Sequence, residues 1–263
     1  MKNFILTFRA ELIKIKSTFA LWLVILGAAF IPFFLLLNYI YNWKKYIPQP
    51  GVNPWHEYLR NGFNSVHFTF LPLLIVLLIA LLLNIEHKSN AWKHIFVLPV
   101  SKSKIFFRKY LVLICLMILF YILVVFFFLT GGVILGLWKS EFNFLKYIPS
   151  YSYHSIQSGI ASFIARSFIS VSAVMAIHFW LSFRLKNLFL NIGIGLAGLI
   201  IAVTMVIGNW ESVVYMPYAF PVLMCNFTPD AQNFLSNFHI YSLIVFFVVS
   251  LLSYLDFSRI FKG

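Results

Sequence analysis

Charged residues are scarce in this sequence: Asp, Glu, Lys and Arg make up 10% of the 263 residues, whereas hydrophobic residues make up 62%. A soluble globular domain carries about 25% charged and about 45–50% apolar residues. Acids are the rarest charged residues, with 7 Asp and Glu against 20 Lys and Arg. This composition excludes an ordinary soluble domain. It indicates an all-α polytopic membrane protein with a single domain over residues 1–263.

Motifs for cofactor and metal chemistry are also missing. Two cysteines, Cys115 and Cys225, cannot make a disulfide framework, and we expect them near opposite membrane faces. The sequence has no H-E-x-x-H, no zinc-spaced pair of Cys or His, and no G-x-x-x-x-G-K-[ST] phosphate loop. We therefore expect no cofactor, no metal site, and no ATP hydrolysis by the chain itself.

Long apolar runs are plentiful. A membrane-spanning helix needs about 20 predominantly apolar residues. Six runs meet this length or approach it, the last being the shortest: Phe19–Tyr41, Val66–Ile85, Leu111–Leu137, Ile160–Phe183, Leu188–Ile207 and Phe238–Leu255. We expect six transmembrane helices.

Basic residues cluster in the connections between these runs. With a cytoplasmic N-terminus, fourteen Lys and Arg fall on the inner side and six on the outer side. This asymmetry predicts that both termini are cytoplasmic and that the chain lies in the plasma (inner) membrane. The net charge of +13 then reflects topology and contact with anionic lipid rather than nucleic-acid binding.

Residues 1–18 show helical periodicity before the first span. Phe4, Ile5, Phe8, Leu12 and Ile15 share one face, and cations flank it. The pattern is typical of an amphipathic helix in the membrane interface. A purely topogenic role for the cations is an equal alternative.

The connection "NIEHKSNAWKHIFVLPVSKSKIFFRKY" (84–110) carries six cations and one acid, Glu86. Burying six cations at the bilayer centre would cost roughly 15–20 kcal/mol, so this loop lies outside the membrane. Ser89 can cap a short helix that Pro99 ends, and Ser101 can cap a second helix that continues into the third span. The first helix would place Ala91, Trp92, Ile95 and Phe96 on one side. A basic, amphipathic, folded loop suggests a docking surface.

Three other features carry expectations. The connection over 208–237 is too apolar for an ordinary solvated loop, so we expect a re-entrant hairpin in the outer leaflet or a cap on the helix ends. Arg166 lies within a span, and we expect it to extend toward the outer surface; a role facing a pathway or a partner subunit is the alternative. His178 fits a hydrogen-bonded interior residue.

The six spans, the N-terminal helix, the basic loop and the outer hairpin resemble the export-type (ABC-2 type) ABC transporter permeases. The most specific similarity is Glu86 followed by "NAWK" (90–93) and "LPVSKSKIFFRK" (98–109), which looks most like the subset associated with lantibiotic immunity and bacitracin resistance. A family permease of this kind works as an identical or mixed dimer with two separate ATPase subunits. Its substrate would be hydrophobic or amphipathic, such as an antimicrobial peptide, antibiotic or lipid-like compound.

The resemblance implies that residues 86–110 form a coupling helix region that enters a groove on the ATPase. Glu86 would cap the loop or pair within it, for example with Lys93 or Lys109, and the apolar residues would fill the groove. The implied coupling residues are Glu86, Trp92, Lys93, Ile95, Phe96, Leu98, Pro99, Lys104 and Lys109.

Two other functions stay open. A non-transporting sensor or scaffold subunit could keep the same docking loop. A membrane-embedded enzyme would need His, Asp, Glu or Ser to converge at one membrane level, and the sequence offers no such cluster.

Overall fold

The computed structural model describes residues 11, 13–16, 18–88, 92, 101–149, 159–226 and 234–260. These residues are helical or irregular, and none of them forms a β-strand. Six helices are long and apolar enough to cross a membrane: α2 (Phe19–Tyr41), α4 (Leu71–Lys88), α6 (Lys102–Trp138), α7 (Ile160–Arg184), α8 (Leu188–Ile207) and α10 (Asn237–Arg259). The expectation of six spans is confirmed.

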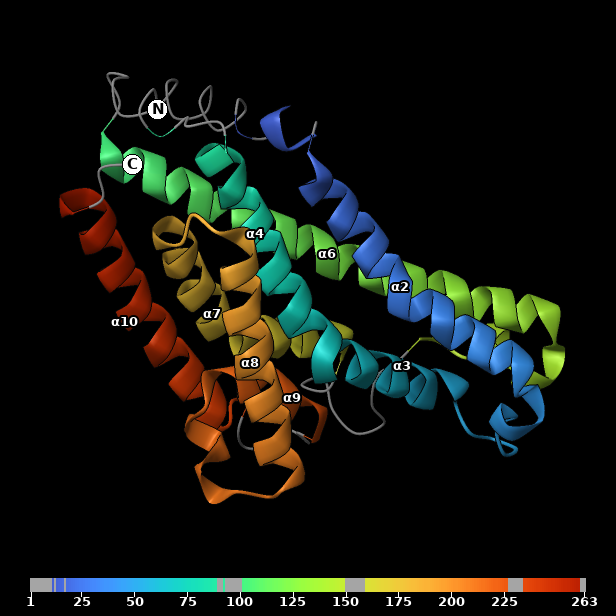
Figure 1. The fold of residues 1–263 in the computed structure, drawn as a ribbon. Coiled ribbons are helices and arrows are strands. Elements are labelled where there is room, and N and C mark those ends of the chain that lie inside the picture. The colour runs from blue at the N-terminus through green and yellow to red at the C-terminus, as the bar shows by residue number, and fades with distance from the viewer. Residues whose placement is uncertain are drawn as a thin grey trace.

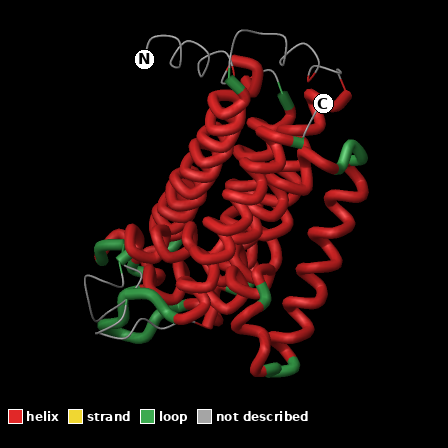
Figure 2. The backbone as a smooth tube through the Cα atoms, turned by 90° about the vertical axis from the view of Figure 1, so that its left-hand side faces the viewer, coloured by secondary structure: helices red, strands yellow, loops and turns green. Residues whose placement is uncertain are grey.

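The long helices lie side by side, with the start of α2 and the end of α10 at the same end of the bundle (Figures 1 and 2). We call this the terminal end, where α2 begins and α10 ends, and we call the opposite end, which holds Tyr41 and Trp138, the distal end. Helix α10 packs along α7, α2 packs along α6, and α4 packs against α7 and α8.

Helix α4 is the centre of the bundle. In its most apolar stretch 67% of the residues are buried, against 28% in α2 and α8 and 22% in α10. The outer helices expose large apolar side chains such as Phe33 of α2, Phe189 of α8 and Phe247 of α10. Such a surface is unfavourable in water and suits lipid.

One helix start agrees with the prediction, and two other features of the spans differ from it. Helix α6 begins at Lys102, next to Ser101 as N-cap residue, and continues without a break into the third span, as the second loop helix was expected to do. Helix α10 has 23 residues and is longer than the run that predicted it. The second span starts with one turn of π-helix, η2 (Val66–Phe70). Pro72 lies two residues after this turn, and it has no backbone N–H to continue the α-helical bonding, so a widened turn suits this place.

A helix that the sequence pattern did not predict, α3 (Pro54–Ser65), lies at the distal end. Asn53 caps it by accepting from the Trp55 backbone N–H at 3.0 Å, and Pro54 occupies the first turn, where its fixed φ is favourable. Short 3₁₀ helices complete this end: η1 (Trp43–Tyr46) before α3, and η3 (Ser140–Phe142) and η4 (Phe144–Lys146) after α6.

Helix α3 approaches α6 closely because α6 has glycine at the contact. A Cβ on Gly131 would lie 2.5 Å from the Tyr58 hydroxyl, and one on Gly132 would lie 2.4 Å from the Trp55 ring. Any larger residue would push α3 away, so the two glycines fix the place of α3 on the bundle.

The described part of the connection between α8 and α10 contains four short helices: η6 (Glu211–Tyr215), η7 (Pro217–Ala219), α9 (Phe220–Leu223) and η8 (Met224–Asn226). Tyr218 in this segment packs on Gly198, which lies midway along α8, so closely that a Cβ on Gly198 would lie 2.8 Å from the tyrosine ring. The segment therefore extends into the bundle as well as covering helix ends.

The predicted N-terminal interfacial helix falls mostly outside the described residues. Residues 11 and 13–16 are helical, and Ile15 among them is buried.

Candidate coupling interface

A buried ion cluster joins three segments at the terminal end. Glu86, near the end of α4, is 0% exposed, and Lys109, in the second turn of α6, is 3% exposed. The Lys109 ammonium donates to Glu86 Oε1, and the Lys14 ammonium donates to the same oxygen at 2.7 Å. The pairing expected between Glu86 and Lys109 is thus present in the structure.

The N-terminal segment contributes both signs of charge to this cluster. Lys14 contacts Glu86, and Glu11 Oε1 lies 3.6 Å from Lys109 Nζ. Two acids and two bases therefore alternate, which offsets much of the cost of burying the central pair. Movement of the N-terminal segment, α4 or α6 would disturb the same four charges.

Trp92 lies against the cluster and inside the bundle. It is 2% exposed, and Lys109 Nζ lies 5.3 Å from its ring centre, within the range of a cation–π contact. Its ring also contacts Phe183 of α7 at 5.6 Å and Phe257 of α10 at 5.9 Å. The permease's own rings thus cover Trp92, and its expected role in filling a partner's groove stays a prediction.

The remaining implied coupling residues fall into two groups. Lys104 is exposed on the first turn of α6, and its carbonyl accepts from Arg108 Nε at 2.9 Å. Five others lie outside the described residues: Lys93, Ile95, Phe96, Leu98 and Pro99.

Two further contacts hold the terminal end together. Asp256 of α10 accepts from Arg184 Nε at 2.6 Å and from Trp180 Nε1 at 2.9 Å, which clamps α10 to α7. His87 Nε2 contacts the Ser182 carbonyl at 2.8 Å, which links α4 to α7. Asp256 was not singled out from the sequence. The sequence did contain a signal for this ion pair, because Asp256 directly follows the last apolar run and Arg184 directly follows another run.

Arg166 does not extend toward the surface, so that expectation is wrong. It is 1% exposed, and its guanidinium carbon lies 5.1 Å from the centre of the Phe234 ring. The segment that precedes α10 covers it, and this long-range contact leaves no local signal in the sequence.

His178 is a hydrogen-bonded interior residue, as expected. It is 0% exposed, with Nδ1 2.9 Å from Asn191 Oδ1 and Nε2 2.8 Å from the Tyr218 hydroxyl. A neutral ring satisfies both contacts by donating to the amide oxygen and accepting from the phenol. His178 thereby joins α7 to α8 and to the segment that carries Tyr218.

A second interior histidine, His67, was not singled out from the sequence. Nδ1 lies 2.7 Å from the Phe63 carbonyl, and Nε2 contacts Ser167, which also lies 2.9 Å from the Tyr121 hydroxyl. The side chains of His67, Ser167 and Tyr121 tie η2, α6 and α7 together.

Metal and thiol chemistry gain no support in the part of the chain that the structure describes. No group of three or more His, Cys, Asp or Glu there could hold a metal ion. Both cysteines are free, and the Cys225 thiol donates to the Asn64 carbonyl at 3.4 Å. Burial raises the pKa of the Cys225 thiol to about 12, which disfavours the nucleophilic thiolate.

Comparison of the sequence with known families finds a match that agrees with a bundle of membrane-spanning helices. The sequence profile described as "ABC-2 family transporter protein" matches residues 7–196, which is well over half of the chain. The chain belongs to the ABC-2 transporter family. It is therefore a membrane permease of an ABC transporter, a transport subunit rather than an enzyme, and permeases of this family generally work with an ATPase subunit. No curated protein and no solved structure matches the chain.

Proposed function

We propose that the permease is the membrane subunit of an ATP-driven exporter, built from two permease chains and two ATPase subunits. Its substrate is hydrophobic or amphipathic: an antimicrobial peptide, an antibiotic or a lipid-like compound. The resemblance to lantibiotic-immunity and bacitracin-resistance permeases supports this substrate class. The terminal end faces the cytoplasm of the plasma (inner) membrane, which agrees with the excess of Lys and Arg in the segments at that end.

The observation that carries the proposal is the buried pair of Glu86 and Lys109. These residues flank the loop over 86–110, one in α4 and one in α6, so the pair fastens the two ends of the loop to each other. A force on the loop from an ATPase would therefore move α4 and α6 together. Since α4 is the most buried span, this movement reaches α7 and α8 as well.

Trp92 takes a different role from the one implied by the resemblance. In our proposal it anchors the loop to α7 and α10, because its ring contacts both Phe183 and Phe257. The ATPase contact falls to the neighbouring residues Lys93, Ile95, Phe96, Leu98 and Pro99, together with the exposed Lys104 of α6.

The segment over 208–237 is proposed to be a re-entrant hairpin on the outer side. Two contacts support this: the Tyr218 hydroxyl lies 2.8 Å from His178 Nε2, and its ring lies over Gly198, halfway along α8. A polar backbone at that depth must be covered by protein, and α7, α8 and α10 provide the cover.

The test is co-purification with an ABC ATPase encoded beside this chain. Phe96→Ala should weaken binding by at least about 2 kcal/mol, the cost of removing an interface hot spot, which is about 30-fold in affinity. The control is Phe107→Ala. Phe107 is an aromatic residue near the start of α6, and it is 56% exposed on the helix surface. ATP turnover should appear only with the ATPase present, since the permease has no phosphate-binding loop. Full assembly and full turnover with Phe96→Ala would contradict the docking proposal.

A further inference from the structure

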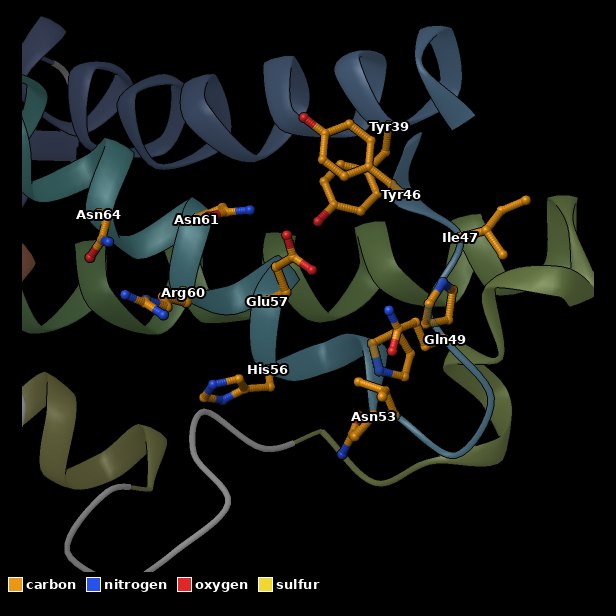
Figure 3. A pocket seen from close by; sticks show the side chains of 13 residues that line it. Tyr39, Tyr46, Ile47, Gln49, Asn53, His56, Glu57, Arg60, Asn61 and Asn64 are labelled. Carbon is orange, nitrogen blue, oxygen red and sulfur yellow. The ribbon is translucent and has the colours of Figure 1, made fainter. Parts of the chain in front are cut away.

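The distal end has a pocket that the coupling function does not use. It lies between the end of α2, η1 and α3 and has a volume of about 640 Å³ (Figure 3). This volume falls within the roughly 300–1,000 Å³ of small-molecule sites.

The pocket wall formed by α2 and η1 is held in place by side-chain contacts. Tyr39 and Tyr46 stack with ring centres 4.0 Å apart, and Asn38 Nδ2 donates to the Tyr46 hydroxyl at 3.0 Å. Tyr39 also meets the Tyr58 ring edge-on at 5.1 Å. The two rings therefore have a defined place before any ligand arrives.

The wall formed by α3 is equally fixed. One face of α3 is buried on the bundle, and Gly131 and Gly132 of α6 allow that face its close approach. Asn53, the capping residue, also donates to the Ile148 carbonyl at 3.1 Å. A pocket between two fixed walls loses little entropy on binding, which favours affinity.

The other face of α3 presents polar groups to the pocket. Glu57, Arg60, Asn61 and Asn64 follow one another at helical spacing and line the cavity, and His56 lies beside them. Helix α3 is therefore amphipathic, and its polar face lines a cavity together with Tyr39 and Tyr46 (Figure 3).

Glu57 and Arg60 stand one turn apart but form no ion pair with each other or with another described residue. Opposite charges at this spacing commonly pair. Here the Glu57 carboxylate extends toward the Tyr39 and Tyr46 rings, and Arg60 lies further along α3, near His56 (Figure 3). The pocket therefore has an acidic, aromatic pole and a separate basic pole.

We propose that this pocket binds a zwitterionic group, with an ammonium at the acidic pole and an anionic oxygen group at the basic pole. A carboxylate with two aromatic rings is a favourable site for an ammonium, through charge and cation–π attraction. The Arg60 guanidinium matches a carboxylate or phosphate with two parallel hydrogen bonds. Two sources share this chemistry: the headgroup of a zwitterionic phospholipid and the two ends of a short peptide. The role of this site in transport rests on the proposed export function. The binding itself does not depend on that function.

Binding is tested on the full chain in nanodiscs made only of phosphatidylglycerol, which is anionic and not zwitterionic. The calorimetric probes are dihexanoyl phosphatidylethanolamine and trialanine, each compared with a partner that lacks the ammonium: dihexanoyl phosphatidylglycerol and N-acetyl-trialanine. At least one zwitterion should bind 10-fold or more tightly than its partner, and the one that does identifies the source. Equal affinity within both pairs, or no binding by either zwitterion, would overturn the proposal.

Charge variants assign the binding to this pocket. Glu57→Gln and Arg60→Gln should each weaken zwitterion binding by 10-fold or more. Both side chains are exposed, so the variants should elute from gel filtration as the wild type does. The matched controls are Glu141→Gln and Lys146→Gln, which remove one acid and one base that are exposed at the same end but do not line the pocket. Unchanged binding in the pocket variants, or an equal loss in the controls, would refute the assignment.

Failure of this proposal is distinguishable from failure of the proposed function. The pocket variants should co-purify with the ATPase as the wild type does, because the pocket and the ion cluster lie at opposite ends of the bundle. Loss of zwitterion binding with assembly intact would remove only the site. Absence of any ATPase assembly with binding intact would remove only the transport role.

Discussion

Replacing Lys109 by methionine should destabilise the permease far more than replacing an exposed lysine on the same helix. Lys109→Met leaves the carboxylate of Glu86, which is 0% exposed, without its buried partner. Breaking a buried ion pair in this way costs about 3–5 kcal/mol. Lys14 still contacts Glu86 at 2.7 Å, but its side chain is 37% exposed and partly screened by water. We therefore expect a loss near the lower limit, about 3 kcal/mol.

The double variant Glu86→Met/Lys109→Met gives the sharper result. It removes both buried charges, and Lys14 and Glu11 remain partly exposed to water. Replacing a buried pair by apolar residues of similar size is often neutral. The double variant should therefore recover at least half of the stability that Lys109→Met loses.

The free energy of unfolding can be measured by SDS titration, with tryptophan fluorescence as the signal. Lys104→Met is the control, because Lys104 is exposed on the first turn of the same helix and should stay within about 0.5 kcal/mol of the wild type. If Lys109→Met matched this control, Glu86 would not depend on Lys109. If the double variant lost as much stability as Glu86→Met and Lys109→Met lose together when each is made alone, the argument from an uncompensated buried charge would fail.

Two further predictions concern topology and packing. Lys104→Cys should react with an impermeant thiol reagent only from the cytoplasmic side, and Glu141→Cys only from outside. The reason is that these two exposed residues lie at opposite ends of α6. Labelling of both variants from one side would refute the six-span orientation. Gly132→Ala should lower the free energy of unfolding by about 1–3 kcal/mol, because its Cβ would lie 2.4 Å from the Trp55 ring. The control Gly193→Ala, whose Cβ would have nothing within 4 Å, should be neutral or stabilising by up to about 1 kcal/mol. Equal unfolding free energies for the two variants would contradict the close approach of α3 and α6.

The spans were predictable from sequence because a membrane helix carries its signal in one continuous stretch. The bounds of α2 and α8 coincide with the apolar runs, and the start of α6 beside Ser101 follows from its place after Pro99. Helix α3 was missed because its polar face interrupts the apolar pattern. Its signals were local but weaker: Asn53 and Pro54 at the start, then apolar residues at helical spacing.

The site was only partly predictable, for a related reason. The pairing of Glu86 with Lys109 could be anticipated, since both residues flank one loop and the loop has a single acid. The involvement of Lys14 and Glu11 could not, because it depends on where the N-terminal segment lies against α4. The buried position of Trp92 depends likewise on α7 and α10, which lie far away in sequence. Local patterns identify chemistry, and long-range packing decides which groups meet.

Helix α6 runs from the ion cluster at the terminal end to the contact with α3 at the distal end. Its 37 residues contain no proline and span about 55 Å at 1.5 Å per residue. Lys109 lies in its second turn, and Gly131 and Gly132, on which α3 rests, lie in its last turns. A helix without a break tilts or slides as one body. A tilt that begins at the ion cluster must therefore displace α3 and change the width of the pocket between α3 and the paired tyrosines. If the pocket binds the proposed zwitterion, its affinity would then report on movement at the terminal end, which is transmitted along α6.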